Sequence, residues 1–272
     1  MSELLKRILS AAVLIPVVFF LIFWENSLAF AVAIYLVIIL GNMEMIRLAK
    51  SSNLPASPIL FWLGALAVYP CFHLPNSWQL LGFVIVGIIF LTFAIKLFSE
   101  TPTDDVMSFI SVNIFGALFF PLFFSFMWLI RDFNAQGSYL IFFLCVIVWL
   151  SDSCAYFVGR AIGKRKIVPK VSPKKSLEGF IAGAIGGVGG GVAFYYLFLA
   201  GSMELSIVKV IIISVDVVAA GMLGDLFESM LKRSAGVKDS GNVIPGHGGI
   251  LDRMDSLMFA APVLFMYLSL WG

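Results

Sequence analysis

Residues 225–255 read DLFESMLKRSAGVKDSGNVIPGHGGILDRMD, and an apolar segment lies on each side of this run. Five acidic and four basic side chains are interspersed within it. Acidic side chains inside or at the edge of a membrane segment are expensive, and they usually mark an ion, a substrate or a proton path. The flanking segments therefore predict membrane helices, and the charged run between them predicts the working part of the chain.

The composition supports a membrane protein over a soluble one. Of the 272 residues, 61% are hydrophobic and only 12% are charged, and the mean hydropathy is +1.02. About a quarter of the residues of a soluble domain are charged. The net charge of +2 says little by itself, and we expect no nucleic-acid partner. The cysteines, Cys71, Cys145 and Cys154, have neither a metal-binding spacing nor a disulfide framework, so we expect them to be packing residues.

The apolar segments predict an all-α, polytopic bundle of about nine transmembrane helices, because a spanning helix needs roughly 17–25 mostly apolar residues. The third segment is short and contains Pro58 and Pro70, and the first is interpreted as an uncleaved helix rather than a signal peptide. We expect one membrane domain over residues 1–272, in which residues 1–130 are mainly scaffold and residues 138–272 carry the catalytic site. The nine spans lie near residues 8–24, 27–46, 58–72, 79–98, 106–130, 138–160, 178–200, 205–230 and 256–271.

The distribution of Lys and Arg predicts the orientation, since cytoplasmic loops carry an excess of these residues. With a cytoplasmic N-terminus and nine spans, only Arg131 and Lys209 of the 18 Lys and Arg residues fall outside the cytoplasmic segments. Both long polar loops, 160–177 and 231–255, then lie on the cytoplasmic face. The compact length suggests a bacterial inner membrane, with the active site on its cytoplasmic side.

Two pairs of acids predict a cation site. Asp225 and Glu228 are three residues apart near the end of the eighth span, and Asp252 and Asp255 are three apart at the start of the ninth. On a helix this spacing places each pair on one face, and an oxygen-rich anionic pocket suits Mg²⁺. Alternatively, Asp252 and Asp255 are first-turn acids that are stabilised by the helix dipole. This alternative does not explain Asp225. Asp216 is assigned no role.

The bases that follow these acids predict phosphate binding. Lys232 and Arg233 come one turn after the acids, and Lys238 and Asp239 lie in the loop. Glycines on both sides of His247 permit tight turns and expose backbone amides that, together with Lys and Arg, bind phosphates. A structural role and a phosphate contact both remain open for His247.

The loop after the sixth span is a second basic segment, with seven Lys and Arg residues between positions 160 and 175. It ends in SPKKSLEG, residues 172–179, in which Ser176 is expected to cap the seventh span and Glu178 lies in the first turn. A phosphate there would meet free amides as well as Lys174 and Lys175, although an anchor to anionic headgroups would also be basic. Asp152, at the end of the sixth span, is a further candidate for the polar site.

The glycines between residues 183 and 191 lie inside the seventh span, where small residues let helices approach closely. A phosphate-cradling loop is the alternative, but no strand precedes them and no Gly-Lys-Ser/Thr follows. We therefore expect helix packing here.

Together these features predict phosphoryl or nucleotidyl transfer at the membrane surface, with a lipid and a nucleotide as substrates. Such catalysis is mainly positioning and neutralisation of charge by metal and cationic side chains. A lipid phosphomonoester is already an anionic nucleophile near neutral pH, since its second pKa is about 6–7. No dedicated strong base is therefore required.

The segment Ser229–Asp255 resembles the full signature of the phosphatidate cytidylyltransferases, or CDP-diacylglycerol synthases. SPKKSLEG is similar to a second motif of that family, with Ser176 where Thr is common, and GDLFES at Gly224–Ser229 also fits. The signature positions that agree are Ser229, Lys232, Arg233, Lys238, Asp239, Pro245, His247, Gly248, Gly249, Asp252, Arg253 and Asp255.

The resemblance implies that CTP and phosphatidic acid give CDP-diacylglycerol and pyrophosphate with Mg²⁺, by attack of a phosphatidate oxygen on the α-phosphorus of CTP. It also implies a homodimer in the bilayer, and it leaves a second cation open. Asp225, Asp252 and Asp255 would hold the metal, and the catalytic residues would be Lys232, Arg233, Asp225 and Asp252. The remaining ligand-binding positions would be Ser172, Lys174, Lys175, Ser176, Glu178, Asp152, Lys238, Asp239, His247 and Arg253.

Two other functions remain open at this point. A CTP-dependent polyprenol or lipid-alcohol kinase has related motifs, but it would need a group that deprotonates an alcohol. An ion-coupled transporter would also place acids in the membrane, although such sites usually lie near the midplane between repeats.

Overall fold

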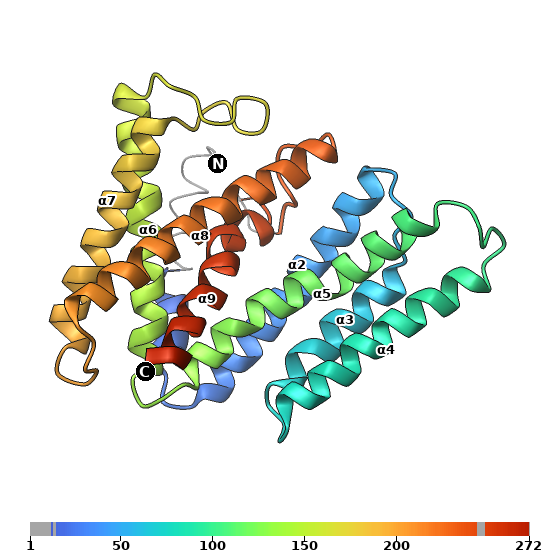
Figure 1. The fold of residues 1–272 in the computed structure, drawn as a ribbon, viewed down its shortest axis with the longest axis horizontal. Coiled ribbons are helices and arrows are strands. Elements are labelled where there is room, and N and C mark those ends of the chain that lie inside the picture. Colours follow the sequence, from blue (N-terminus) through green and yellow to red (C-terminus); the bar gives the residue numbers. More distant parts are fainter. Residues whose placement is uncertain (1–11, 13–14, 244–247, 272) are drawn as a thin grey trace. The chain divides into compact units, whose positions relative to one another are not determined.

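The computed structural model describes residue 12, residues 15–243 and residues 248–271 (Figure 1). Within the first predicted span, 8–24, residues 15–23 are helical. Lys6, Arg7, Pro245, Gly246 and His247 lie outside the described residues. The predictions made for them therefore stay predictions.

The described residues are helical and contain no strand, which confirms the all-α class. A π-helical turn, η1 (Tyr195–Leu199), directly continues α7. Among the described residues, seven helices are long and apolar enough to cross a membrane, and α3 is a shorter apolar helix. The count of nine spans and the cytoplasmic N-terminus stay predictions. The α-helices are α2 (Ser27–Ser51), α3 (Pro58–Cys71), α4 (Ser77–Leu97), α5 (Val106–Arg131), α6 (Gly137–Ile162), α7 (Leu177–Phe194), α8 (Ile207–Ser234) and α9 (Leu251–Trp271).

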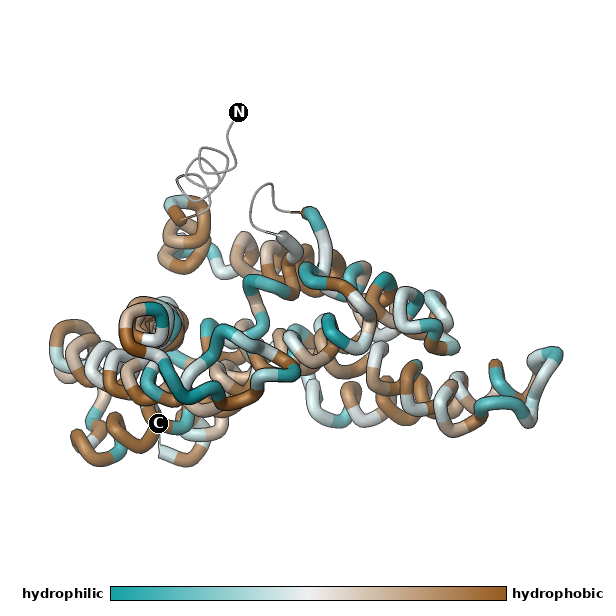
Figure 2. The backbone as a smooth tube through the Cα atoms, turned by 90° about the horizontal axis from the view of Figure 1, so that it is seen from above, coloured by the Kyte–Doolittle hydropathy of each residue, from teal (hydrophilic) through white to brown (hydrophobic). Residues whose placement is uncertain are grey.

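The hydropathy of the backbone follows the same division (Figure 2). Hydrophobic residues dominate the helices, and hydrophilic residues gather mainly in the segments that connect them. This agrees with helices whose exposed side chains face lipid, such as Phe83 and Phe90 on α4, which are 75% and 71% exposed. The chain is therefore an integral membrane protein by composition and helix length.

The chain divides into two compact units, and each is described by itself. Unit 1 contains Met1–Val17, Leu28–Trp128 and Leu231–Arg253. Unit 2 contains Val18–Ser27, Leu129–Met230 and Met254–Gly272.

Small residues allow the helices of unit 1 to approach closely. A Cβ added at Gly64 of α3 would lie 1.8 Å from the carbonyl oxygen of Ala117 on α5. Asn42 of α2 donates its side-chain amide to the carbonyl of Phe61 on α3 at 2.5 Å. Close backbone approach and interhelical hydrogen bonds drive helix association in lipid, so these contacts hold α2, α3 and α5 together.

The glycines of α7 perform the packing role that the sequence predicts. A Cβ at Gly183 would lie 2.9 Å from the carbonyl oxygen of Ser151 on α6, and one at Gly187 would lie 3.0 Å from that of Ile147. The two helices consequently run side by side along their length (Figure 1). The helix-packing interpretation is confirmed, and this close contact fixes the loop that joins α6 to α7.

Candidate active site

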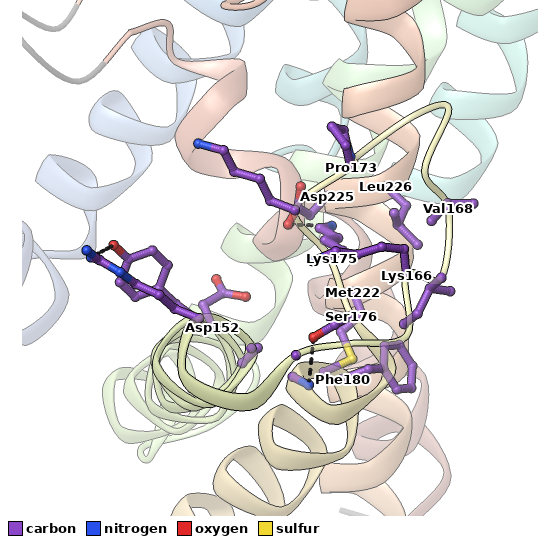
Figure 3. Close-up of a pocket in the computed structure, with 18 residues that line it drawn as sticks. Asp152, Lys166, Val168, Pro173, Lys175, Ser176, Phe180, Met222, Asp225 and Leu226 are labelled. Atoms are coloured by element: carbon purple, nitrogen blue, oxygen red, sulfur yellow. Dashed lines mark hydrogen bonds and ion pairs between the residues drawn. The ribbon is translucent and has the colours of Figure 1, made fainter.

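Unit 2 contains a pocket of about 670 Å³ that joins α6, the loop after it, the start of α7, and α8. Two carboxylates and four cationic side chains line it, together with apolar residues such as Phe180 and Met222. Figure 3 shows Asp152 of α6 and the Lys175–Asp225 pair directed into the same space. The charged lining residues are Asp152, Arg160, Lys166, Lys174, Lys175 and Asp225.

Asp225 and Lys175 form an ion pair across this pocket. The Nζ of Lys175 lies 2.6 Å from Oδ2 of Asp225, and the two side chains are 28% and 33% exposed. Both groups are thus partly accessible to a solute in the pocket. The pairing explains how Asp225 is tolerated in an apolar helix, because intramembrane acids usually pair with a cation.

Local hydrogen bonds give the basic loop a defined shape. The Oγ of Ser176 accepts a hydrogen bond from the amide of Gly179 at 3.2 Å, which confirms that Ser176 caps α7. The amide of Leu177 donates to the carbonyl of Arg165 at 2.8 Å, so the loop returns on itself. Lys174 and Lys175 therefore lie in a loop of defined shape, directly before the N-terminus of α7.

Glu178 fixes the other side of this loop. Its carboxylate accepts hydrogen bonds from the amide of Lys164 at 3.1 Å and from the amide of Arg165 at 3.3 Å. Neither Glu178 nor Ser172 lines the pocket. In this structure Glu178 holds the backbone at Lys164 and Arg165, and its contact with a ligand stays a prediction.

The pocket also contains residues to which the sequence analysis assigned no site role. Arg160 of α6 donates from Nη1 to the phenol oxygen of Tyr156 at 3.1 Å, and both line the pocket with Lys166. Arg160 and Lys166 were counted only as basic loop residues. The four-residue spacing of Tyr156 and Arg160, which places them on one face of a helix, was the available signal.

In unit 1, Asp252 is held by donors on both oxygens. Its Oδ1 pairs with Nζ of Lys232 at 2.6 Å, and the side chains are 9% and 13% exposed. Its Oδ2 accepts from the amide and hydroxyl of Ser240, each at 2.9 Å, and from the amide of Gly249 at 2.8 Å. Asp252 lies in the first turn of α9, so its negative charge is also stabilised by the positive end of the helix dipole.

Glu44 of α2, which the sequence analysis missed, contacts the same segment. Its carboxylate is fully buried and accepts hydrogen bonds from Ser240, Ile250 and Leu251. An acid inside the apolar run 27–46 was the available signal, since such residues are rarely without a role.

The other predicted residues have more local contacts. Arg233 donates to the carbonyl of Val237 at 3.3 Å, and Oδ1 of Asp255 accepts from the amide of Ser256 at 2.8 Å. Lys238, Asp239 and Arg253 are exposed. Their contacts with substrate stay predictions.

Within unit 2, α8 and α9 approach closely beside two of the predicted metal ligands. A Cβ at Gly224 would lie 2.3 Å from the carbonyl oxygen of Asp255, and Asp225 follows Gly224 directly. Farther along α8, Asp216 accepts a hydrogen bond from the hydroxyl of Tyr267 on α9. This contact supplies the structural account that the sequence lacked for Asp216.

The predicted Mg²⁺ site can be tested only against donor chemistry. Within each unit, the described residues contain no group of three or more His, Cys, Asp or Glu side chains placed to hold a metal. Asp225 and Asp255 belong to unit 2 and Asp252 to unit 1. Mg²⁺ is usually bound by one or two carboxylates together with substrate phosphates and water, so these carboxylates fit the ion by chemistry, and the ligand set stays a prediction.

Comparison with known proteins gives consistent matches along the whole chain. A family model described as the cytidylyltransferase family matches residues 5–271. A phosphatidate cytidylyltransferase of Bacillus subtilis is 34% identical over 276 aligned positions, which cover 100% of both chains. Proteins of the same name from Thermotoga maritima and Pseudomonas aeruginosa are each 33% identical, over 98% of this chain and 96% and 98% of theirs.

Proposed function

The chain belongs to the cytidylyltransferase family, and from this membership we propose that it transfers the cytidylyl group of CTP to phosphatidic acid. The products are CDP-diacylglycerol and pyrophosphate. The observation that carries the proposal is the match along the full length to relatives named for this activity. The pocket of unit 2, which combines cations with acids at the end of membrane helices, supports it.

The reaction forms one bond and breaks one. A phosphatidate oxygen attacks the α-phosphorus of CTP, the bond from that phosphorus to the bridging oxygen of the β-phosphate breaks, and pyrophosphate leaves with the electron pair. Phosphoryl chemistry of this kind depends on positioning and on neutralising the phosphate oxygens. We assign the neutralisation to Lys174, Lys175, Arg160 and Lys166 in the pocket, and to Lys232 and Arg233.

The Lys175–Asp225 pair gives the pocket a means to accept both reactants. When a phosphate enters, Lys175 can exchange Asp225 for the phosphate oxygens, because the new hydrogen bond between lysine and phosphate also joins two charged groups and is similarly strong. The carboxylate of Asp225 is then available to a cation. A bound Mg²⁺ would neutralise charge on the reacting and leaving phosphates, and Asp225, Asp252 and Asp255 would hold it.

We place the reaction on the cytoplasmic face of a bacterial inner membrane. The excess of Lys and Arg in the predicted cytoplasmic loops and the bacterial sources of the relatives support this location. The homodimer implied by the resemblance stays a prediction.

Labelled CTP distinguishes this function from the alternatives. Purified protein is incubated with phosphatidic acid, MgCl₂ and CTP labelled at either the α- or the γ-phosphate, and the lipids are extracted. We expect the α-label in the lipid and the γ-label in pyrophosphate. Transfer of the γ-label to an added polyprenol would instead identify a lipid-alcohol kinase. Ion or solute flux without nucleotide turnover would identify a transporter.

A further inference from the structure

Glu44 is a charged residue inside a membrane helix, α2, and it lies outside the family signature that the sequence analysis used. It is the eighteenth residue of α2, and its side chain is 0% exposed. Burying a carboxylate is strongly unfavourable unless the charge is compensated by several donors. The structure must therefore supply that compensation, and the source of the donors indicates what Glu44 does.

All three donors come from one segment about 200 residues later in the chain. The hydroxyl of Ser240 lies 2.9 Å from Oε2 of Glu44, the amide of Ile250 lies 3.0 Å from Oε1, and the amide of Leu251 lies 2.9 Å from Oε2. The last two amides belong to the start of α9, where N–H groups have no acceptor within the helix. Glu44 thus caps α9 from a different helix, and its charge is favoured by the positive end of the helix dipole.

The segment is shaped to fit this carboxylate. A Cβ at Gly241 would lie 2.4 Å from Oε1 of Glu44, and a Cβ at Gly249 would lie 2.4 Å from Oε2. Any larger residue at either position would displace the carboxylate or the backbone. Gly248, with φ of 84°, adopts the left-handed conformation that favours glycine and turns the chain toward α9. Backbone on both sides of residues 244–247 therefore closes on Glu44.

The same segment determines where Asp252 and Lys232 lie. The hydroxyl of Ser240 is 2.9 Å from Glu44 and also 2.9 Å from Asp252; since a hydroxyl donates one hydrogen, the two carboxylates share this donor. The amides of Ser240 and Gly249 hold Asp252 directly. We propose that Glu44 is a positioning residue. It holds Ser240 and the backbone of residues 249–251, and through them the Asp252–Lys232 pair, in the arrangement that cytidylyl transfer requires.

The proposal rests on the proposed function for its kinetic consequence, and Glu44→Gln tests it with little change of shape. The new amide group faces an N–H donor where an oxygen accepted before, so one charge-assisted hydrogen bond is lost. We expect kcat to fall by about 10- to 100-fold. KM for CTP should change less than about 3-fold, because the hydrogen bonds that Glu44 accepts come from Ser240, Ile250 and Leu251, none of which lines the pocket. Glu44→Asp keeps the charge but is shorter, and it should restore only part of kcat.

A second readout does not depend on activity. Full-length protein in detergent is treated with trypsin, and cleavage is measured after Lys238, which lies in the segment, and after Lys170, which lies in the other basic loop and serves as internal standard. Both lysines are exposed. We expect Glu44→Gln to raise cleavage at Lys238 relative to Lys170 by about 5-fold or more, since local opening follows the stability of the contacts that close the segment. Asn42→Ala is the matched control, because Asn42 is also buried on α2 but bonds to α3. It should lower thermal stability without either effect.

The outcomes separate the two proposals. If wild-type protein forms no CDP-diacylglycerol, the proposed function fails and the kinetic role of Glu44 fails with it, while the cleavage ratio still reports whether Glu44 holds the segment. If wild-type protein is active and Glu44→Gln retains kcat within 3-fold, the positioning role is overturned. It is also overturned if the cleavage ratio is unchanged, or if Asn42→Ala reproduces both effects.

Discussion

Substitution of Lys175 distinguishes a residue that binds substrate from one that only neutralises Asp225. The ion pair is short, at 2.6 Å, but its side chains are 28% and 33% exposed. Solvent screens such a pair, and exposed pairs contribute about 0.2–1 kcal/mol. Lys175→Ala and Asp225→Asn should therefore each lower the melting temperature by no more than about 4 °C. In a double-mutant cycle, the coupling energy should not exceed about 1 kcal/mol.

The effect on turnover should be larger than the effect on stability. If Lys175 binds a substrate phosphate, its removal loses a hydrogen bond between charged groups, which contributes about 1.5–3 kcal/mol. We therefore expect KM for CTP or for phosphatidic acid to rise by about 10- to 150-fold. Varying each substrate in turn with the α-label assay identifies which phosphate Lys175 meets.

Two comparisons make this prediction refutable. Lys170→Ala removes the same charge from the same loop, but Lys170 does not line the pocket, so its KM values should stay within about 3-fold of wild type. The double variant Lys175→Ala/Asp225→Asn should recover stability relative to the single variants but not activity. Recovery of KM in the double variant would mean that Lys175 serves only to balance Asp225.

Two further substitutions examine the helix starts. Ser176→Ala removes the cap of α7 and should lower the free energy of unfolding by about 1 kcal/mol; an unchanged melting temperature in detergent would contradict this role. Asp252→Asn places an amide against the donors Lys232, Ser240 and Gly249 and should reduce turnover below about a tenth of wild type at saturating Mg²⁺, with the protein still monodisperse. Asp216→Asn is its control, because the hydroxyl of Tyr267 can donate to the amide oxygen instead, and activity close to wild type is expected.

The sequence predicts the helices well because the bilayer imposes a simple rule. Each long apolar run from residue 27 onward became a helix within a few residues of its expected bounds, and α3, expected to be short, has 14 residues. The start of α9, at Leu251 rather than residue 256, differs by five residues, as does the end of α2, at Ser51 rather than residue 46. Hydropathy places the start of the ninth span after the last charged residue, Asp255. The helix α9 begins earlier, inside the charged run, because Glu44 accepts hydrogen bonds from the amides of Ile250 and Leu251.

Some residues of the candidate site can be predicted from the local sequence pattern, and others cannot. Helix caps and basic loops are determined by residues that are neighbours in sequence. The role of Ser176 as the cap of α7 could therefore be predicted. Glu44 depends on Ser240, 196 residues away, and such a contact leaves no periodic or short-range signal. Arg160 and Lys166 were visible only as members of a basic loop, since which of its cations line a pocket is decided by how α6, α7 and α8 pack.

Two of the described acids, Asp225 and Asp252, share one arrangement, which helps to explain why acids and bases are interspersed in this sequence. Asp225 pairs with Lys175 and Asp252 with Lys232, each at 2.6 Å, and each pair carries no net charge before substrate arrives. A neutral pair is far less costly near lipid than a lone ion. In the proposed reaction, a substrate phosphate on the lysine and a divalent cation on the carboxylate would replace the two partners of a pair together. Such an exchange would leave no unpaired charge, and each acid is tolerated near lipid by its lysine before a substrate arrives.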